Sequence, residues 1–220
     1  MKIAIGNAGF VEILETFGND LTVVNAARVS FHKESNVFTS RDEGLIKYLA
    51  KHNHNSPFFH PQIRFRLKMP IFVAREWFRH TIGFSRNEVS RRYVDDEPEI
   101  WIPEELRKRD PNAKQGSQAS AVEFNEAAVE IYKLTTKVAV ESYNTLLTAG
   151  VAPEVARGIL PQAMYTEFIE TASLAGYARL CSLRLDPHAQ KEIREFAEAV
   201  STLMAKQFPV SWSALTTKWV

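Results

Sequence analysis

Apolar residues recur along this chain mostly at the three- and four-residue spacing that is typical of amphipathic helices. The spacing predicts helices over residues 21–30, 41–52, 71–81, 119–148, 153–160, 164–184 and 188–207. Asp20 stands where a side chain would cap the first of these helices, and Gly150 is placed to end the long fourth helix. The chain is therefore expected to be rich in helix.

Two segments alternate with a period of two instead, which is typical of strands. Residues 62–69 send apolar side chains to one side and basic ones to the other, the apolar set being Ile63, Phe65, Leu67 and Met69. Residues 10–16 alternate more loosely and predict a second strand, whereas 31–40 and 94–118 are polar and predict a loop and a surface connection. A helix-rich chain with a small sheet indicates the α+β class, in a single domain over residues 1–220.

Composition and charge exclude several classes of protein. The chain has 220 residues, 45% of them hydrophobic, and a net charge of +1, which supports neither nucleic-acid binding nor a membrane-surface role. Its N-terminal stretch has acidic interruptions unlike a signal peptide, and no apolar window is long enough to span a membrane. The one cysteine, Cys181, fits a reducing cytoplasm, and the six histidines lack metal-site spacing, so no metal is expected.

A basic stretch over residues 75–93 holds the candidate chemistry. On a helix, Arg75 and Arg79 share one face, and Glu76 and His80 share the next. The loop that follows supplies further polar groups, namely Glu88, Ser90, Arg91 and Arg92. Such a set can bind a phosphate through charge-assisted, bidentate hydrogen bonds. The alternative is a solvated surface network, because the helix dipole alone favours cations near a helix C-terminus.

Outside this stretch the candidates are single residues. Arg157 and Arg184 lie near predicted helix ends, where one arginine is more often a cap or an ion-pair partner than a ligand. Cys181 lies in an amphipathic helix and is expected to be a buried structural thiol. The glycine patterns of dinucleotide-binding, phosphate-binding and serine-hydrolase loops are all missing from the sequence.

The run Arg79-His80, then Asn87-Glu88-x-Ser90-x-Arg92-Tyr93, resembles the signature of flavin-dependent thymidylate synthases. Further blocks resemble that family in the same order, namely AARVSF (26–31), HNHNSPF (52–58), PIFVAREWFRH (70–80), PEVARGILP (153–161) and LRLDPHAQKEI (183–193). Together the blocks cover most of the chain outside 94–118. The resemblance implies the fold of this family.

The resemblance also implies an activity. Enzymes of this family convert dUMP to dTMP, with methylenetetrahydrofolate as the carbon donor and with NADPH reducing a bound FAD that supplies hydride. They are typically homotetramers with active sites at subunit junctions. Dependence on FAD, NADPH and folate, and a homotetrameric assembly, are therefore expectations for this chain.

Site residues carried over by position fall into two sets. The flavin set is Ser30, His54, Ser56, Arg79, His80 and Ile82, joined by three positions that differ from the family, Thr81, Ser173 and Arg179. The nucleotide set is Glu76, Arg79, Glu88, Ser90, Arg91, Arg92, Arg157 and Arg184. Within these sets Arg184 would bind the uracil ring and Arg92 the phosphate, and both would act in catalysis together with Ser90 and His54.

Several positions depart from the family pattern. The substituted positions are Phe59 for glutamate, Glu76 for glutamine, Thr81 for arginine, Arg91 for a small residue, and Ser173 and Arg179 for asparagine. The loop before Ser90 is also one residue longer, so Ser85 or Arg86 is a candidate replacement for the missing arginine. Glu76 is predicted to pair with Arg91 or Arg79.

These departures leave three functions open. The first is methylation of dUMP, and the second is a related modification, either hydroxymethylation or action on dCMP. The third is a nucleotide-binding descendant without catalysis, against which the retained arginines of the signature argue.

Overall fold

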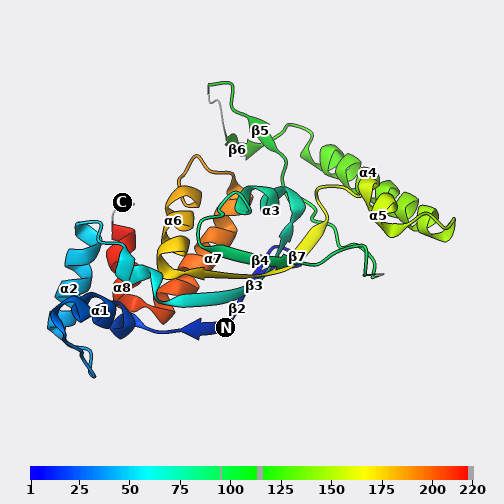
Figure 1. Ribbon diagram of the computed structural model, residues 1–220. Helices are drawn as coiled ribbons and strands as arrows, with labels where there is room; N and C mark the ends of the chain where they lie inside the picture. The colour runs from blue at the N-terminus through cyan, green and yellow to red at the C-terminus, as the bar shows by residue number, and fades with distance from the viewer. Residues whose placement is uncertain (95, 113–115, 218–220) are drawn as a thin grey trace.

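The computed structural model describes residues 1–94, 96–112 and 116–217 of the chain. Its centre is a five-stranded antiparallel sheet (Figure 1). The strands follow the order β1 (Lys2–Ile5), β2 (Gly9–Phe17), β3 (Gln62–Pro70), β7 (Tyr165–Ser173) and β4 (Phe84–Glu88). A separate hairpin is formed by β5 (Arg107–Arg109) and β6 (Ser117–Ala121). The α+β class with a small sheet, predicted from the sequence, is confirmed.

Helices supply the rest of the regular structure. They are α1 (Asp20–Arg28), α2 (Ser40–Lys51), α3 (Ile71–Trp77), α4 (Asn125–Thr148), α5 (Pro153–Ala156), α6 (Leu174–Arg184), α7 (Lys191–Gln207) and α8 (Pro209–Thr216). Three short 3-10 turns join them, η1 (Val29–Phe31), η2 (Ser56–Phe59) and η3 (Arg157–Ile159). Among the described residues, no helix is long and apolar enough to cross a membrane.

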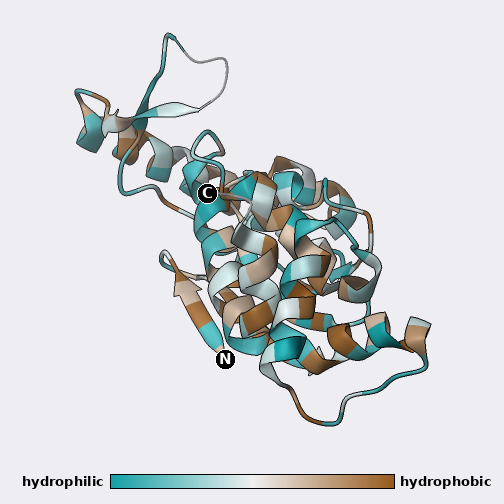
Figure 2. Cartoon of the chain, turned by 90° about the vertical axis from the view of Figure 1, so that its left-hand side faces the viewer, coloured by the Kyte–Doolittle hydropathy of each residue, from teal (hydrophilic) through white to brown (hydrophobic). Residues whose placement is uncertain are grey.

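The core lies between one face of the sheet and the helices α3, α6 and α7 (Figure 1). The apolar side of β3 is fully buried, as its alternation predicts, and the ring of Phe65 meets that of Tyr177 edge-on with 5.1 Å between centroids. In Figure 2 the helices carry both hydrophobic and hydrophilic residues, as expected for amphipathic elements. The opposite face of the sheet bears charged side chains, including Arg64, which pairs with Glu15 at 3.0 Å.

The main error of the sequence-based prediction is a helix over residues 164–184. Only its second half, α6, is helical, and the first half is strand β7. The apolar residues Tyr165, Phe168 and Ile169 imitate helical spacing, but the backbone of this segment pairs with β3 on one edge and β4 on the other. Tertiary pairing therefore overrides the local pattern.

Smaller corrections concern element ends. The cap of α1 is Asn19, whose side chain accepts from the backbone of Leu21 and Thr22, and not Asp20. Asp20 instead accepts from the backbone amides of Val210 and Ser211 at the start of α8. Helix α3 ends at Trp77 and α4 begins at Asn125, so both are shorter than predicted.

The sequence pattern does not predict β1, β4, α8 or the two strands of the hairpin. The hairpin begins within residues 94–118, which are predicted to be a surface connection, and its second strand continues to Ala121, into the segment predicted as helix. Positions 95 and 113–115 lie outside the described residues. Arg107 anchors the hairpin by donating to both oxygens of Glu192 on α7, at 2.7 and 2.9 Å. This bidentate pair fixes one wall of the cleft described next.

Candidate active site

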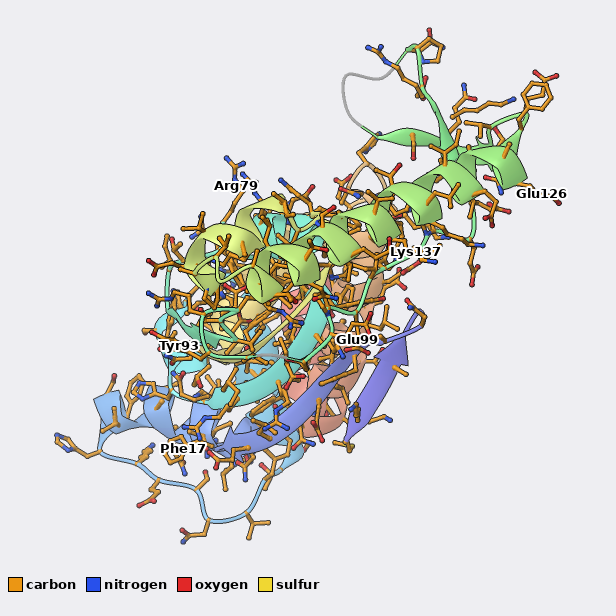
Figure 3. All side chains as sticks on the ribbon, turned by 90° about the vertical axis from the view of Figure 1, so that its right-hand side faces the viewer. Phe17, Arg79, Tyr93, Glu99, Glu126 and Lys137 are labelled. Atoms are coloured by element: carbon orange, nitrogen blue, oxygen red, sulfur yellow. The ribbon has the colours of Figure 1, made fainter. Side chains whose placement is uncertain are left out.

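A cleft of 1680 Å³ opens between β1, the hairpin and α7, and it reaches the ends of α3 and α6. Charged residues from the middle and the C-terminal part of the chain line it, including Glu76, Arg79, Arg107, Arg184, Glu192 and Arg194. Arg79 is exposed, and no ion-pair partner for it lies within the described part of the chain. Its side chain extends outward in Figure 3. The cleft can therefore offer a free guanidinium to an anion.

Arg184, the last residue of α6, is held in place at this cleft by three hydrogen bonds. Its Nε donates to His80 Nε2 at 2.9 Å, and its Nη2 donates to the Glu76 backbone oxygen at 3.2 Å. Its Nη1 lies 3.4 Å from Glu76 Oε2, forming an ion pair. All three nitrogens of the guanidinium are engaged, so its plane and charge have a fixed position before any ligand arrives.

The partner of Glu76 differs from the sequence-based hypothesis. Glu76 pairs with Arg184, while Arg91 pairs with Asp96 at 3.3 Å and also donates to the Asp96 backbone oxygen. The predicted pairing of Glu76 with Arg91 or Arg79 is therefore wrong. Glu76 and Arg184 meet because α3 and α6 end beside each other, a contact that the sequence pattern does not contain.

The imidazole of His80 accepts the hydrogen bond from Arg184 only while it is neutral at Nε2. Burial first, and then the positive charges of nearby arginines, lower the pKa of His80 from 6.5 to about 4. A proton at Nε2 would repel the guanidinium and break the bond. His80 is therefore a neutral acceptor near pH 7, with its proton on Nδ1.

This arrangement predicts a pH dependence of stability. In the unfolded chain the histidine takes up a proton near pH 6.5, whereas in the folded chain it does so only near pH 4. The unfolded state then binds more protons below pH 6.5, so the free energy of unfolding falls as the pH drops from 6.5 towards 4. We expect urea unfolding to show a smaller loss between pH 7 and 5 in His80→Gln, which accepts a hydrogen bond without titrating. Equal losses in both proteins would contradict this role for His80.

A second group of predicted residues lies away from this cleft. Glu88 and Arg91 line a hollow of 420 Å³ that shares no lining residue with the cleft. Glu88 Oε1 accepts from Thr166 Oγ1 at 2.6 Å, which fixes its carboxylate. Arg92 is exposed, with its guanidinium 5.0 Å from the Tyr93 ring centre. Within one chain, the predicted nucleotide residues of the cleft and those of this hollow therefore lie apart.

Arg157 belongs to neither hollow. It is exposed in η3, which packs against α4, and it has no ion-pair partner among the described residues. A single chain therefore does not bring Arg157 into the cleft that Arg184 lines.

Most of the predicted flavin residues lie on or beside α6 or follow the end of α3. His54 and Ser56 are exposed at η2, which packs against α6, and Arg179 is exposed on α6 itself. The remaining exposed members are Ser30 in η1 and Thr81 and Ile82 in the turn between α3 and β4.

Ser173 is the exception within the flavin set. It is buried, and its hydroxyl accepts from the backbone amide of Gly176 at 3.1 Å, capping α6. The structure thus gives this hydroxyl a capping role.

The sequence-based prediction missed a buried ion pair behind this site. Glu170 on β7 is fully buried, accepts from Trp77 Nε1 at 3.2 Å and pairs with Arg86 on β4. Arg86 also lies over the rings of Phe84 and Phe78, 4.6 and 5.4 Å from their centres. Arg86 is committed to the core, so it does not present a free guanidinium in place of the missing arginine. The sequence signal for this pair is a glutamate at an inward-facing position of a strand. The helix predicted over residues 164–184 concealed that position.

Cys181 is fully buried in α6 and donates weakly to the Ala197 backbone oxygen at 3.7 Å. Burial raises the pKa of its thiol well above the usual value, and the nearby Glu170 carboxylate raises it further. Because only the thiolate is a good nucleophile, this residue is inert at neutral pH. The prediction of a buried structural thiol is confirmed. No cluster of metal-ligating side chains occurs in the described portions of the chain.

Known proteins resemble the chain over nearly its whole length. The family model described as thymidylate synthase complementing protein matches residues 12–210. A flavin-dependent thymidylate synthase of Thermotoga neapolitana is 40% identical over 217 residues, 97% of this chain and 94% of its own length. The enzyme of that name from Thermus thermophilus is 38% identical over 214 residues, 97% of this chain and 78% of its own.

A solved structure agrees with these matches. The UMP/dUMP methylase PolB from Streptomyces cacaoi, bound with 5-Br dUMP, gives a TM-score of 0.87 at 32% sequence identity, and the match covers 98% of this chain and 97% of that one. The predicted fold and enzyme class are confirmed by the agreement of family model, relatives and structure. The chain therefore belongs to the family of flavin-dependent thymidylate synthases.

Proposed function

We propose that this chain methylates dUMP to dTMP reductively, with FAD as cofactor, methylenetetrahydrofolate as carbon donor and NADPH as reductant. The observation that carries the proposal is the fixed guanidinium of Arg184 on the wall of a cleft where Arg79 is free. A uracil carbonyl and a phosphate each need such a group. The solved relative that binds 5-Br dUMP supports the same class of substrate.

The nucleotide site is proposed to form between copies of the chain. Glu76, Arg79 and Arg184 share one cleft, whereas Glu88 and Arg91 line another hollow, with Ser90 and Arg92 next to them in sequence. A single nucleotide can meet both sets only if a second copy brings its hollow to the first copy's cleft. Arg157, which lines neither of them, would then reach the site from another copy as well. This division supports the homotetramer that the family resemblance implies.

The residues around α6 fit a flavin. FAD presents a pyrophosphate and a flat ring, and the exposed Arg79 and Arg179 could hold the pyrophosphate while His54 and Ser56 supply polar contacts. Ser30 and Ile82 complete the proposed set. Thr81 cannot supply the charge of the arginine usual at its position, so weak flavin retention is expected. When bound, the flavin supplies hydride to the pyrimidine ring.

The chain's own residues position the substrate and stabilise charge. Negative charge develops on the uracil carbonyls as hydride arrives, and the Arg184 guanidinium is already fixed to stabilise it. His80 keeps this guanidinium in its plane by accepting from Nε, and the Glu76 carboxylate keeps Nη1 from turning away. Most of the contribution is then positioning and fixed electrostatics, without a covalent bond to the protein.

Cys181→Ala tests whether the reaction proceeds without a cysteine thiolate. We expect unchanged turnover, because the thiol on α6 is buried in the hydrophobic core and is not reached by solvent. Stability should fall by about 0.5–1.5 kcal/mol, the usual range for removing one buried methylene-sized group. Initial rates and urea unfolding measure both quantities. Abolished turnover in a folded Cys181→Ala protein would indicate covalent thiol catalysis instead.

The phosphate role proposed for Arg92 is testable with Arg92→Ala. Losing one hydrogen bond to a charged group costs about 1.5–3 kcal/mol, so dUMP affinity should fall by roughly ten- to a hundredfold. Calorimetry with deoxyuridine is the control, because that nucleoside has no phosphate and should be insensitive to the change. Equal effects on nucleotide and nucleoside would assign Arg92 a structural role.

The proposed activity is tested by incubating the purified chain with FAD, NADPH, methylenetetrahydrofolate and dUMP. We expect yellow protein and dTMP as the product, identified by mass spectrometry. Parallel reactions with dCMP, and a search for hydroxymethylated product, test the related modifications. A colourless protein that gains no absorbance with FAD would favour the non-catalytic descendant and overturn the proposal.

A second candidate substrate is UMP, because the similar solved structure is named a UMP/dUMP methylase. Competition between equal concentrations of UMP and dUMP in the same assay decides between them. Preferential methylation of UMP would make the ribonucleotide the substrate.

A further inference from the structure

Arg86 is a largely buried arginine whose hydrogen bonding is incomplete. It lies opposite Glu170 in the register of β4 and β7, and its Nε donates to that carboxylate. Its Nη2 is buried and has no hydrogen-bond partner among the described residues. Apolar side chains of similar size often replace a buried ion pair without loss of stability. The pair of Arg86 and Glu170 therefore calls for a role besides stability.

The pair reaches the backbone that carries His80. Glu170 accepts from Trp77 Nε1, which lies 3.2 Å from each carboxylate oxygen. The Trp77 backbone oxygen in turn accepts from the His80 amide at 3.1 Å. The guanidinium of Arg86 lies 5.4 Å from the centre of the Phe78 ring, between these two residues in sequence. Arg86 and Glu170 therefore fix the end of α3, from which His80 extends.

Arg86 also places a positive charge near His80. Burial lowers the pKa of His80 most. The charges of Arg184, Arg86 and Arg179, in this order, lower it further. Arg184 and Arg179 are on α6, so Arg86 is the one of the three that acts from the sheet. A His80 protonated at Nε2 cannot accept from Arg184, so the charge of Arg86 protects that hydrogen bond.

The other charged groups around His80 come from α3 and from the elements packed against it. Helix α7 and the strands β3 and β7 contact α3, and β3 turns apolar side chains to the core. The remaining charged side chains are Glu76 and Arg79 at the end of α3, Glu170 on β7, and Arg194, Glu195 and Glu198 on the cleft side of α7. A carboxylate favours a protonated imidazole, so within this set the arginines are the groups that favour neutral His80.

We propose that Arg86 is a positioning residue for the reaction: held by Glu170, it keeps His80 as the acceptor that orients the Arg184 guanidinium. Arg86 acts through His80, without a contact of its own to the nucleotide. An apolar pair of the same size would keep the fold but not this charge. The inference rests on the proposed function for the role of Arg184, whereas the link from Arg86 to His80 can be measured without substrate.

Two variants separate the charge of Arg86 from its packing. Arg86→Lys keeps a cation beside Glu170, whereas Arg86→Met/Glu170→Gln removes both charges and keeps an acceptor for the Trp77 indole. NMR of the histidine rings follows the protonation of His80, and His80→Gln identifies its signal among the six histidines. We expect the pKa of His80 to stay at about 4 in Arg86→Lys and to rise toward 6.5 in the double variant.

The pH profile of activity is the second measurement. In the double variant, kcat/KM for dUMP should begin to fall at a higher pH than in the wild-type chain, and Arg86→Lys should follow the wild-type profile. A pair with a structural role alone would lower kcat/KM by the same factor at every pH. That result would overturn the inference.

An unchanged pKa of His80 in a double variant that circular dichroism shows to be folded would also overturn it. Arg86→Gln/Glu170→Gln, whose two amides can bond to each other, takes the place of a double variant that does not fold. Absence of product with any pyrimidine nucleotide, together with the expected rise in pKa, would overturn the proposed function while supporting the link from Arg86 to His80.

Discussion

Arg184→Ala is expected to lower kcat/KM for dUMP by about 10²–10³-fold, the usual loss when one preorganised donor to a developing negative charge is removed. The reason is that His80 and Glu76 fix the guanidinium before the nucleotide binds, so that no free energy is spent on orienting it during the reaction. Initial rates over a range of dUMP concentrations separate the effect on kcat from that on KM.

Arg184→Lys is the matched control. Lysine keeps the positive charge but has one nitrogen, so it cannot donate to His80 and to Glu76 in the same geometry. We expect it to recover only a small part of the lost rate. Full activity in Arg184→Lys would show that charge alone matters, and full activity in a folded Arg184→Ala would remove Arg184 from the mechanism.

The second large effect is expected at Glu170. Glu170→Ala should lower the free energy of unfolding by about 3–5 kcal/mol, the typical cost of leaving one partner of a buried ion pair alone. The variant leaves the Arg86 guanidinium, whose side chain is 14% exposed, and the Trp77 indole N–H without their acceptor. Urea unfolding at pH 7, followed by tryptophan fluorescence, measures the change.

The double variant Arg86→Met/Glu170→Leu is the control for this prediction. Apolar side chains of similar size often replace a buried pair without loss, because neither charge then needs to be desolvated. We expect the double variant to be more stable than Glu170→Ala. If it is less stable, the pair itself stabilises the fold and the argument from an orphaned charge is wrong.

Burial raises the pKa of Glu170, while Arg86 and Trp77, which donate to it, lower it. The carboxylate therefore depends on both neighbours for its charge. The pair also lies behind His80, whose pKa Arg86 helps to lower. Loss of Glu170 should accordingly disturb the site as well as the core.

The period of apolar residues predicts an element correctly when one face of that element lies in the core and the other lies in solvent. β3 is the clearest case, because its alternation between apolar and basic residues is the same as its division between core and solvent. β7 fails because buried residues lie on both of its faces, so that its apolar spacing resembles that of a helix. β4 fails because its charged and polar residues gain their strand geometry only from pairing with β7.

The site shows the same limit at another level. Local spacing places Glu76 and His80 together at the end of one helix, and the structure keeps them together around Arg184. Local spacing contains no information on which other helix ends beside these two residues. For that reason the predicted partner of Glu76 is wrong. Similarly, the short separation in sequence between His80 and Arg92 conceals the turn into β4, which carries Glu88 and Arg91 away from the cleft.

The connection between β4 and β7 has a consequence for how relatives of this chain can diverge. These two strands are paired, yet the chain leaves the sheet after Glu88 and returns only at Tyr165, having built the hairpin and α4 on the way. The entropy of closing a loop grows only with the logarithm of its length, about 0.6 kcal/mol for each doubling. Insertions or deletions in this excursion therefore cost the sheet little. Selection on its length acts through the cleft wall, which can change while the sheet and the helices α3 and α6, which position His80 and Arg184, stay the same.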